Sequence, residues 1–267
     1  MIYLGPAGIP IKAKSTLDGM HVLKERGLNA MEVEFVYHAN TKPETAEEIG
    51  KEAKKNGIRL SAHAPYYINL NSKSKETVKK SRNWIYKVAE LCDIMEAPII
   101  VFHPGFYHGM KEDVVERNIK RQLNLMLRRI RRENWDVLLG LEITGKRSAW
   151  GTIEEIVEMC KQVEGTIPVV DFAHHHARMG GSLKDRNDFE YLFSKYEELG
   201  NDLMHCHLSC IKYGDKGEIE HLDLGEGEPD YGPGIPVFLE KKYDIVFILE
   251  THGKDDDALK LKKMLGL

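Results

Sequence analysis

The 267-residue chain has few of the features that mark secreted, membrane-spanning or strongly nucleic-acid-binding proteins. Its four cysteines form no Cys-x-x-Cys pair, which disfavours a disulfide framework and a structural cysteine–zinc site. No apolar run approaches the roughly 18 residues that a membrane helix needs, and the first residues lack the pattern of a signal peptide. The net charge of −4 disfavours non-specific binding to DNA. We therefore expect a cytoplasmic protein with no membrane contact.

Eight short apolar runs recur along the chain, with starts roughly 30 to 40 residues apart, the length of one strand–helix unit. Near-continuous apolarity, as in Pro98–Phe102, is typical of strands buried on both faces of a parallel sheet. The segments between the runs have helical patterns. The eight predicted strands are Ile2–Gly5, Met31–Val36, Ile58–Ala62, Ile99–Phe102, Val137–Leu141, Ile167–Val170, Leu203–Leu208 and Ile245–Leu249.

Three of the intervening segments carry specific helix signals. Glu44–Asn56 precedes Gly57, and glycine is the preferred residue just beyond the end of a helix. Lys75–Met95 places its main apolar residues near one helical face. Thr152–Val163 begins with a threonine followed three residues later by Glu155, which is a capping-box pattern.

Eight strand–helix units predict an α/β fold, a single (β/α)8 TIM barrel, as one domain over residues 1–267. No linker or shift in composition divides the chain. The alternative is an open, doubly wound sheet. It is disfavoured because the spacing is regular and no Gly-x-Gly-x-x-Gly motif follows the first run.

The last residues of six consecutive runs are histidines and carboxylates. In a barrel the carboxyl ends of the strands meet at one rim, and these side chains are the ligands of zinc, manganese or non-haem iron. A single such residue is more often a hydrogen-bonded buried group, but several buried carboxylates would repel one another without cations between them. The six are His63, His103, Glu142, Asp171, His207 and Glu250, and His174 and His221 lie close in sequence to two of them.

Eight candidate ligands exceed the about four that one zinc ion takes. Two or three ions are therefore predicted if a carboxylate bridges them, and Zn²⁺, Mn²⁺ and non-haem iron all remain open from the ligand types alone. Adjacent ions suit in-line displacement at phosphorus. The other histidines near the rim, His175, His176 and His205, are expected to be supporting or surface groups.

At these residues the chain resembles endonuclease IV, the zinc-dependent apurinic/apyrimidinic endonucleases among the xylose-isomerase-like barrels. Each matching segment is short, but the set occurs in the family's order and covers most of the chain. The segments are 63–70 (HAPYYINL), 102–105 (FHPG), 141–142 (LE), 171–174 (DFAH), 207–208 (HL), 224–227 (LGEG) and 249–251 (LET).

The resemblance implies hydrolysis of the phosphodiester 5′ to an abasic site in double-stranded DNA, as in base excision repair, leaving a 3′-hydroxyl. Glu250 would orient or deprotonate the nucleophile, and Glu142 would bridge two ions. The implied first zinc ligands are His63, His103 and Glu142; the second set is Glu142, Asp171, His207 and Glu250; the third includes His174 and His221.

The sequence also departs from the family's pattern. The family usually has an aspartate two residues before the position of His221, where this chain has Ile219, and Glu218, Glu220 or Asp223 are the alternatives for this ligand. Ile143 follows Glu142 where the family often has asparagine. The glycine-alanine-histidine opening and the basic loop after the second strand are replaced by residues 4–8 (LGPAG) and 36–42 (VYHANTK).

Two residues after the third strand are candidate substrate contacts. Tyr66 matches a position from which the family inserts a side chain into the duplex, although an aromatic residue there can also cap the barrel. Asn69 is expected to contact substrate or, preferentially, to brace its own turn. The basic run Arg128–Arg132 is expected to be a solvated helix face, with a DNA-backbone patch as the alternative. We expect a monomer.

Two other functions remain open at this stage. A sugar isomerase or epimerase would need one Mn²⁺, Mg²⁺ or Co²⁺, and its usual ligand set is supplied by Glu142, Asp171, His207 and Glu250. Three histidines are then surplus: His63, His103 and His174. A metal-bound protein without catalytic activity that recognises damaged DNA or a sugar phosphate is the third hypothesis. About one metal ion per chain favours the isomerase, and two or three favour the nuclease.

Overall fold

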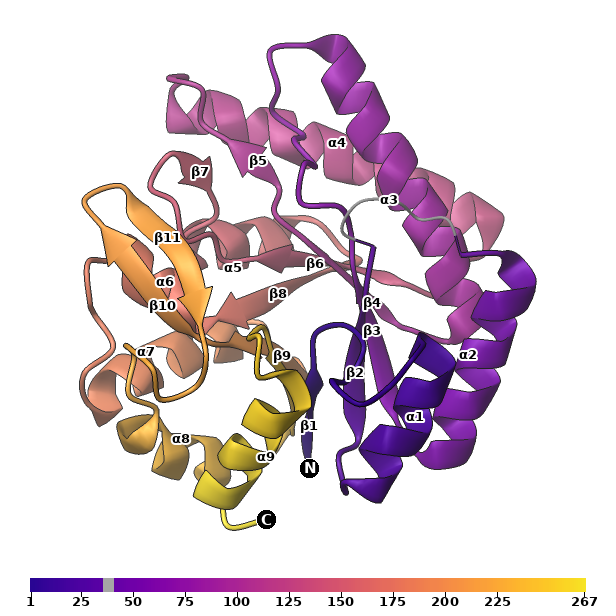
Figure 1. Ribbon diagram of the computed structural model, residues 1–267. Helices are drawn as coiled ribbons and strands as arrows, with labels where there is room; N and C mark the ends of the chain where they lie inside the picture. The colour runs from indigo at the N-terminus through magenta and orange to yellow at the C-terminus, as the bar shows by residue number, and fades with distance from the viewer. Residues whose placement is uncertain (36–40) are drawn as a thin grey trace.

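Eight parallel strands form a nearly closed barrel (Figure 1). The computed structural model describes residues 1–35 and 41–267. The barrel strands are β1 (Ile2–Pro6), β2 (Ala30–Glu34), β3 (Arg59–His63), β4 (Ile99–Phe102), β6 (Leu138–Glu142), β8 (Thr166–Asp171), β9 (Leu203–Leu208) and β12 (Asp244–Leu249). Strands that succeed one another in the chain are neighbours all the way round. β1 and β2 meet through one bridge, between Ala7 and Glu32.

The strand order confirms the predicted (β/α)8 barrel and excludes the open doubly wound sheet. The predicted runs coincide closely with the barrel strands. The predicted second strand ended at Val36, which lies outside the described residues, whereas β2 ends at Glu34.

Helices cover the outside of the barrel (Figure 1). The predicted signals form as expected: Gly57 ends its helix with a left-handed φ of 70°, and Thr152 and Glu155 form a reciprocal capping box. None of the described helices is long and apolar enough to cross a bilayer. The helices are α1 (Thr16–Glu25), α2 (Pro43–Asn56), α3 (Lys75–Met95), α4 (Glu112–Glu133), α5 (Ile153–Gln162), α6 (Phe172–Arg178), α7 (Arg186–Glu197), the short 3₁₀ helix η1 (Gly232–Gly234), α8 (Ile235–Glu240) and α9 (Lys254–Met264).

The barrel interior holds a thin aliphatic layer. Ile99 and Val101 of β4 pack there against Ile167 and Val169 of β8, although β6 lies between these strands. The contact is possible because β6 has Gly140 at the intervening inward position: a Cβ there would lie 2.9 Å from the Val169 side chain. The larger apolar core lies between the strands and the helices.

Strand alternation then carries polar side chains to the rim above this layer. Side chains two residues apart point the same way, so Val169 is followed inward by Asp171 and Val101 by His103. The register supports this placement, because Val169 is level with His205 and Asp171 is level with His207 on β9. The same alternation that buries the aliphatic layer therefore assembles the candidate ligands.

Two small antiparallel sheets of two strands each extend from the rim, and the second of them is a hairpin (Figure 1). They are formed by β5 (Gly105–Phe106) with β7 (Ala149–Trp150), and by β10 (Cys210–Gly214) with β11 (Gly217–Leu222). In the β10–β11 hairpin, Lys212 pairs with Glu220 and Tyr213 pairs with Glu218, so Ile219 has no partner across the hairpin. This extra residue is a β-bulge.

Candidate metal centre

All eight side chains that the sequence predicted as ligands converge at the rim. Each belongs to a group of at least three ligand atoms lying within 4.8 Å of one another. His63, Glu142 and Asp171 end their strands, His103 and Glu250 directly follow theirs, His207 lies within β9, His174 within α6 and His221 within β11. Their convergence is a structural finding, and their role as metal ligands stays a prediction.

Glu142 lies at the centre of the cluster, and its two oxygens face different histidines. Oε2 is 3.0 Å from His63 Nε2 and 2.7 Å from His103 Nε2. Oε1 is 3.0 Å from His207 Nδ1 and 3.4 Å from His174 Nδ1. The side chain is fully buried. A carboxylate with one oxygen in each of two ligand groups has the arrangement that a bridging ligand requires.

The second group consists of Glu142, Asp171, His207 and Glu250. His207 Nδ1 lies 3.1 Å from Glu250 Oε1. Asp171 Oδ1 accepts the backbone N–H of His174 at 2.6 Å and so caps α6. Asp171 Oδ2 is buried and makes no hydrogen bond in the described part of the chain, although His174 Nδ1 lies 3.2 Å from it as an ion-pair contact. A buried carboxylate oxygen without a donor is costly unless a cation approaches it.

Three of the histidines have one ring nitrogen fixed by a backbone carbonyl. The Nδ1 atoms of His63, His174 and His221 lie 2.7, 3.0 and 3.1 Å from the carbonyl oxygens of residues 64, 143 and 250. Donation from Nδ1 leaves the Nε2 lone pair free to face the cluster. Such a contact to the second nitrogen is typical of histidines that bind metals.

The third group consists of His174, Glu218 and His221. His174 Nε2 lies 3.6 Å from Glu218 Oε2, and His221 Nε2 lies 4.0 Å from Glu218 Oε1. The bulge at Ile219 explains this arrangement, because it places Glu218 on the same hairpin face as His221, three residues later, while Ile219 is 57% exposed. Gly145 makes room, since a Cβ there would lie 2.7 Å from the Glu218 Cβ.

Glu218 is therefore the carboxylate that the geometry favours among the three alternatives that the sequence left open for this position. Glu220 pairs with Lys212 on the exposed side of the hairpin. Asp223 accepts the backbone N–H of Gly253 at 2.8 Å. Neither belongs to a ligand group among the described residues.

The carboxylates at the rim stabilise the protonated form of neighbouring histidines. Burial lowers the pKa of His63, but the hydrogen bond and charge of Glu142 outweigh it and raise that pKa to about 9. Burial also lowers the pKa of His174, yet the charge of Asp171 and the contact with Glu142 raise it to about 10. Burial raises the pKa of Asp171 against the opposing charge of His174. A site that stabilises protonated imidazoles in this way also favours a divalent cation.

Two observations test whether these residues fit the zinc ions that the resemblance implies. The Nε2 atoms of His174 and His221 face each other at 3.1 Å, while both Nδ1 atoms lie against carbonyls. In neutral imidazoles the two Nε2 lone pairs would repel each other in this position unless a proton or a metal cation lies between them. The second observation is Asp171 Oδ2, a buried carboxylate oxygen that makes no hydrogen bond in the described chain. A donor set of imidazole and carboxylate suits zinc, so the residues fit.

A cavity of about 400 Å³ opens above the cluster. Tyr66 lines it and is 59% exposed, so its predicted substrate contact is sterically feasible.

Asn69 is not among the described lining residues, and its side chain is engaged in its own loop, with Oδ1 accepting the Asn71 N–H at 3.2 Å. The divergent loop after the second strand, residues 36–42, lies mostly outside the described residues. The lining residues are Ala7, Glu34, His63, Tyr66, His103, His174, Glu218, His221, Glu250, Thr251, His252 and Lys254.

The two carboxylates that β2 contributes to the barrel interior and the cavity were not identified from the sequence. Glu32 is fully buried and Glu34 reaches the cavity. Both lie in the run that was interpreted only as an apolar strand. Two carboxylates two residues apart in a strand buried on both faces were the available signal, because such residues must point together into the barrel. His205, which was expected to be a supporting or surface group, is buried and bonded to Glu32.

The four arginines of the basic run Arg128–Arg132 are exposed on α4, whereas Ile130 between them is buried in the core. Arg132 pairs with Glu133 at 2.7 Å, and Arg131 lies 3.6 Å from the carboxylate of Glu164. Exposed pairs of this kind contribute little to stability. The arrangement is that of a solvated helix face.

Comparison with known sequences finds a family model and relatives that match most of the chain. A family model described as a xylose isomerase-like TIM barrel matches residues 20–265. An uncharacterised protein of Methanocaldococcus jannaschii is 35% identical over 269 residues, covering 98% of this chain and 96% of the relative. A probable endonuclease 4 of Persephonella marina is 26% identical over 208 residues, covering 74% of this chain and 72% of the relative.

Two solved structures show the same fold. Endonuclease IV from Thermus thermophilus matches with a TM-score of 0.77 and 18% identity, over 98% of this chain and 97% of that one. A D-tagatose 3-epimerase-like protein matches with a TM-score of 0.75 and 21% identity, over 98% and 96%. Together with the sequence relatives, these matches confirm the resemblance to endonuclease IV at the level of the family. The structural matches themselves carry the fold alone.

Proposed function

Because this chain belongs to the xylose isomerase-like TIM-barrel family, we propose that it is a zinc-dependent endonuclease that hydrolyses the phosphodiester 5′ to abasic sites in double-stranded DNA. The observation that carries the proposal is the position of Glu142 between two ligand groups, with a third group beside them on the same cavity. A mononuclear sugar isomerase has no need of the additional histidines His63, His103 and His221.

The residues divide into holding and reacting roles. His63, His103 and Glu142 would hold one ion, Glu142, Asp171, His207 and Glu250 a second, and His174, Glu218 and His221 a third. Zinc held there would supply Lewis acidity toward the phosphate oxygens and the leaving 3′-oxygen. Glu142 is enclosed by histidines and would act through its fixed position.

Glu250 is the candidate for orienting or deprotonating the attacking water. Its side chain is 17% exposed and lines the cavity, whereas Glu142 and Asp171 are completely buried. A general base must come within hydrogen-bond reach of the nucleophile, and Glu250 is the carboxylate of the second group that substrate can approach. Tyr66, on the cavity wall, would contact the DNA.

The test is cleavage of a duplex with one defined abasic site by zinc-loaded protein, with the undamaged duplex as the substrate control. The expected result is a single cut 5′ to the site that leaves a 3′-hydroxyl, together with two or three zinc ions per chain. A Glu250→Gln variant should retain most of the bound zinc and lose cleavage. Fully loaded protein that leaves the abasic duplex intact would refute the proposal.

A sugar epimerase or isomerase is the second candidate, and the cavity wall favours it at one point. Glu34 projects into the cavity, where burial and the charge of Glu250 raise its pKa. A carboxylate there repels a phosphodiester but suits the hydroxyl groups of a sugar. Manganese-loaded protein incubated with D-tagatose distinguishes the two functions: interconversion of ketohexoses with one ion per chain would establish this alternative.

A further inference from the structure

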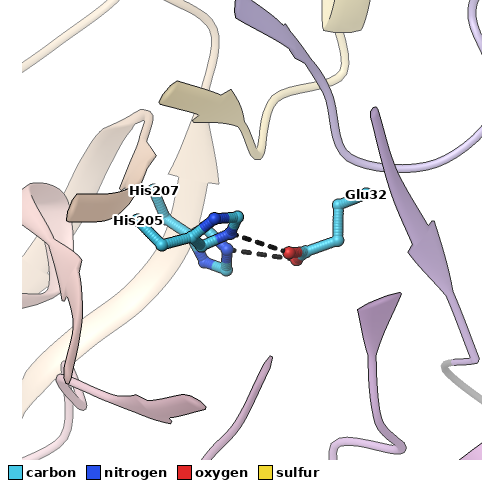
Figure 2. Close-up of side chains that lie close together, drawn as sticks. All are labelled: Glu32, His205 and His207. Atoms are coloured by element: carbon cyan, nitrogen blue, oxygen red, sulfur yellow. Dashed lines mark hydrogen bonds and ion pairs between the residues drawn. The ribbon is translucent and has the colours of Figure 1, made fainter. Parts of the chain in front are cut away.

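Glu32 reaches across the barrel interior from β2 to two histidines on β9 (Figure 2). Its Oε2 lies 3.1 Å from His205 Nε2, and its Oε1 lies 3.1 Å from His207 Nε2. All three side chains are buried, with at most 1% exposed. The cluster therefore lies behind the cavity and contacts the proposed second ligand group through the ring of His207.

The two oxygens of Glu32 differ in their contacts. Glu32 Oε2 also accepts the hydroxyl of Ser61 at 2.7 Å. Glu32 Oε1 and His207 Nε2 make no hydrogen bond in the described chain and face each other as an ion pair at 3.1 Å. Because both atoms are buried, each is the available partner of the other.

His207 is oriented differently from the three carbonyl-bound histidines at the rim. His63, His174 and His221 place Nδ1 against a backbone carbonyl and Nε2 toward the cluster, although Nδ1 of His174 also lies 3.2 Å from Asp171 Oδ2. His207 instead places Nδ1 toward the cluster, 3.0 Å from Glu142 and 3.1 Å from Glu250. Its outer nitrogen faces a carboxylate instead of a carbonyl.

We propose that Glu32 is a positioning residue that fixes the proton of His207 on Nε2 and so directs the Nδ1 lone pair into the second ligand group. An ionised acceptor binds an imidazole N–H more strongly than a carbonyl does and makes the opposite nitrogen a better ligand. Ser61 and His205 hold the carboxylate in place. The inference rests on the proposed function, because it concerns ions bound at the same centre.

The Glu32 cluster is not itself a separate cation site. Its carboxylate already receives Ser61 and His205 on one oxygen and faces His207 with the other. None of these residues belongs to the described cavity lining, so the cluster offers no open coordination position. These contacts allow the Glu32 cluster to support the second ligand group through His207.

Nitrogen NMR of the zinc-loaded full chain with ¹⁵N-labelled histidine tests the inference directly. In the wild type the ring proton of His207 is expected on Nε2, whereas His63, His174 and His221 carry theirs on Nδ1. Zinc titration against a chelator provides the second measurement. Glu32→Gln should raise the Kd of one bound ion by about 10–100-fold, the usual cost of losing such a partner, and leave the other ions in place.

Glu34→Gln is the matched control for zinc affinity, because it makes the same chemical change two residues along β2 at the cavity wall. Unchanged affinity in Glu32→Gln, or a proton on Nδ1 of His207 in the loaded wild type, would overturn the inference. The NMR measurement needs no variant, so poor folding of Glu32→Gln does not prevent the test. Wild-type protein that binds zinc but does not cut abasic DNA would refute the proposed function and leave this inference standing.

Discussion

The ligands on the barrel strands and those on the β10–β11 hairpin reach the same cavity by different structural means. On the strands, hydrogen bonds to two neighbours fix the register, so each inward residue has one possible position. On the hairpin, the bulge at Ile219 decides which carboxylate faces His174. The comparison teaches that the barrel determines the first two ligand groups, whereas a local irregularity determines the third.

Removal of the shared strand ligand should have the largest effect. Glu142→Ala leaves His63 and His103 without their carboxylate, and it also removes one of the four members of the second ligand group. We expect cleavage of abasic duplex to fall by roughly 10³-fold, in the range seen when key charge-stabilising groups are lost, and at least one zinc ion per chain to be lost. The measurements are kcat and elemental analysis of zinc. Full zinc content with wild-type kcat would show that Glu142 does not bridge.

Removal of the hairpin carboxylate should have a smaller and local effect. Glu218→Ala removes the acidic member of the third group and leaves His174 and His221 facing each other. We expect one zinc ion to bind at least about 10–100-fold more weakly, as after loss of a supporting partner, while the other ions keep their affinity. Chelator titration measures this. Glu220→Ala is the matched control on the same strand, because its side chain points to solvent and pairs with Lys212.

A change in the cavity wall separates substrate binding from metal binding. Tyr66 follows β3 and belongs to neither the strands nor the hairpin, and Tyr66→Ala removes an exposed ring without touching a ligand group. We expect KM for abasic duplex to rise about tenfold, which is within the range for loss of one aromatic–base contact, with zinc content unchanged. Steady-state kinetics with elemental analysis checks it. A fall in kcat at constant KM would assign Tyr66 a role other than duplex binding.

The sequence predicted most of the strand-borne centre because period-two alternation and barrel closure leave little freedom. His103 and Asp171 could be placed on one rim from their position after buried runs alone. Ser61, Glu32 and His205 form a layer below that rim. His205 was expected to be a supporting or surface group, and its contact with Glu32 makes it a supporting one. Ser61 and Glu32 were not predicted, because neither ends its run and the contact of Glu32 with β9 joins strands far apart in the chain.

The third group was less predictable for a physical reason. A carboxylate three residues before a histidine points to the opposite side of a regular strand, so Glu218 qualifies only if the strand contains a bulge. Little in the sequence indicates one, since Ile219 is an ordinary strand residue. Pairing with Tyr213 and Lys212, which fixes the bulge, is a property of the folded hairpin.

Deletion of Ile219 should have the smallest effect and tests this account most directly. The paired residues Glu218, Glu220 and His221 keep their partners across the hairpin, because Ile219 itself pairs with none. Glu218 then stands two residues before His221, the spacing at which a regular strand presents both side chains on one face. We expect zinc content and cleavage close to those of the wild type.

A double variant that moves the carboxylate onto the bulge residue provides the contrast to the deletion of Ile219. Glu218→Ala combined with Ile219→Asp restores a carboxylate two residues before His221 but places it at the unpaired, exposed position of the bulge. It should bind the third ion as weakly as Glu218→Ala alone, provided that the bulge persists. Two results would contradict this account: recovery of the third ion in the double variant, or its loss on deletion of Ile219. Either would mean that the hairpin changes its pairing register and that His174, on the barrel side, determines which carboxylate binds the ion.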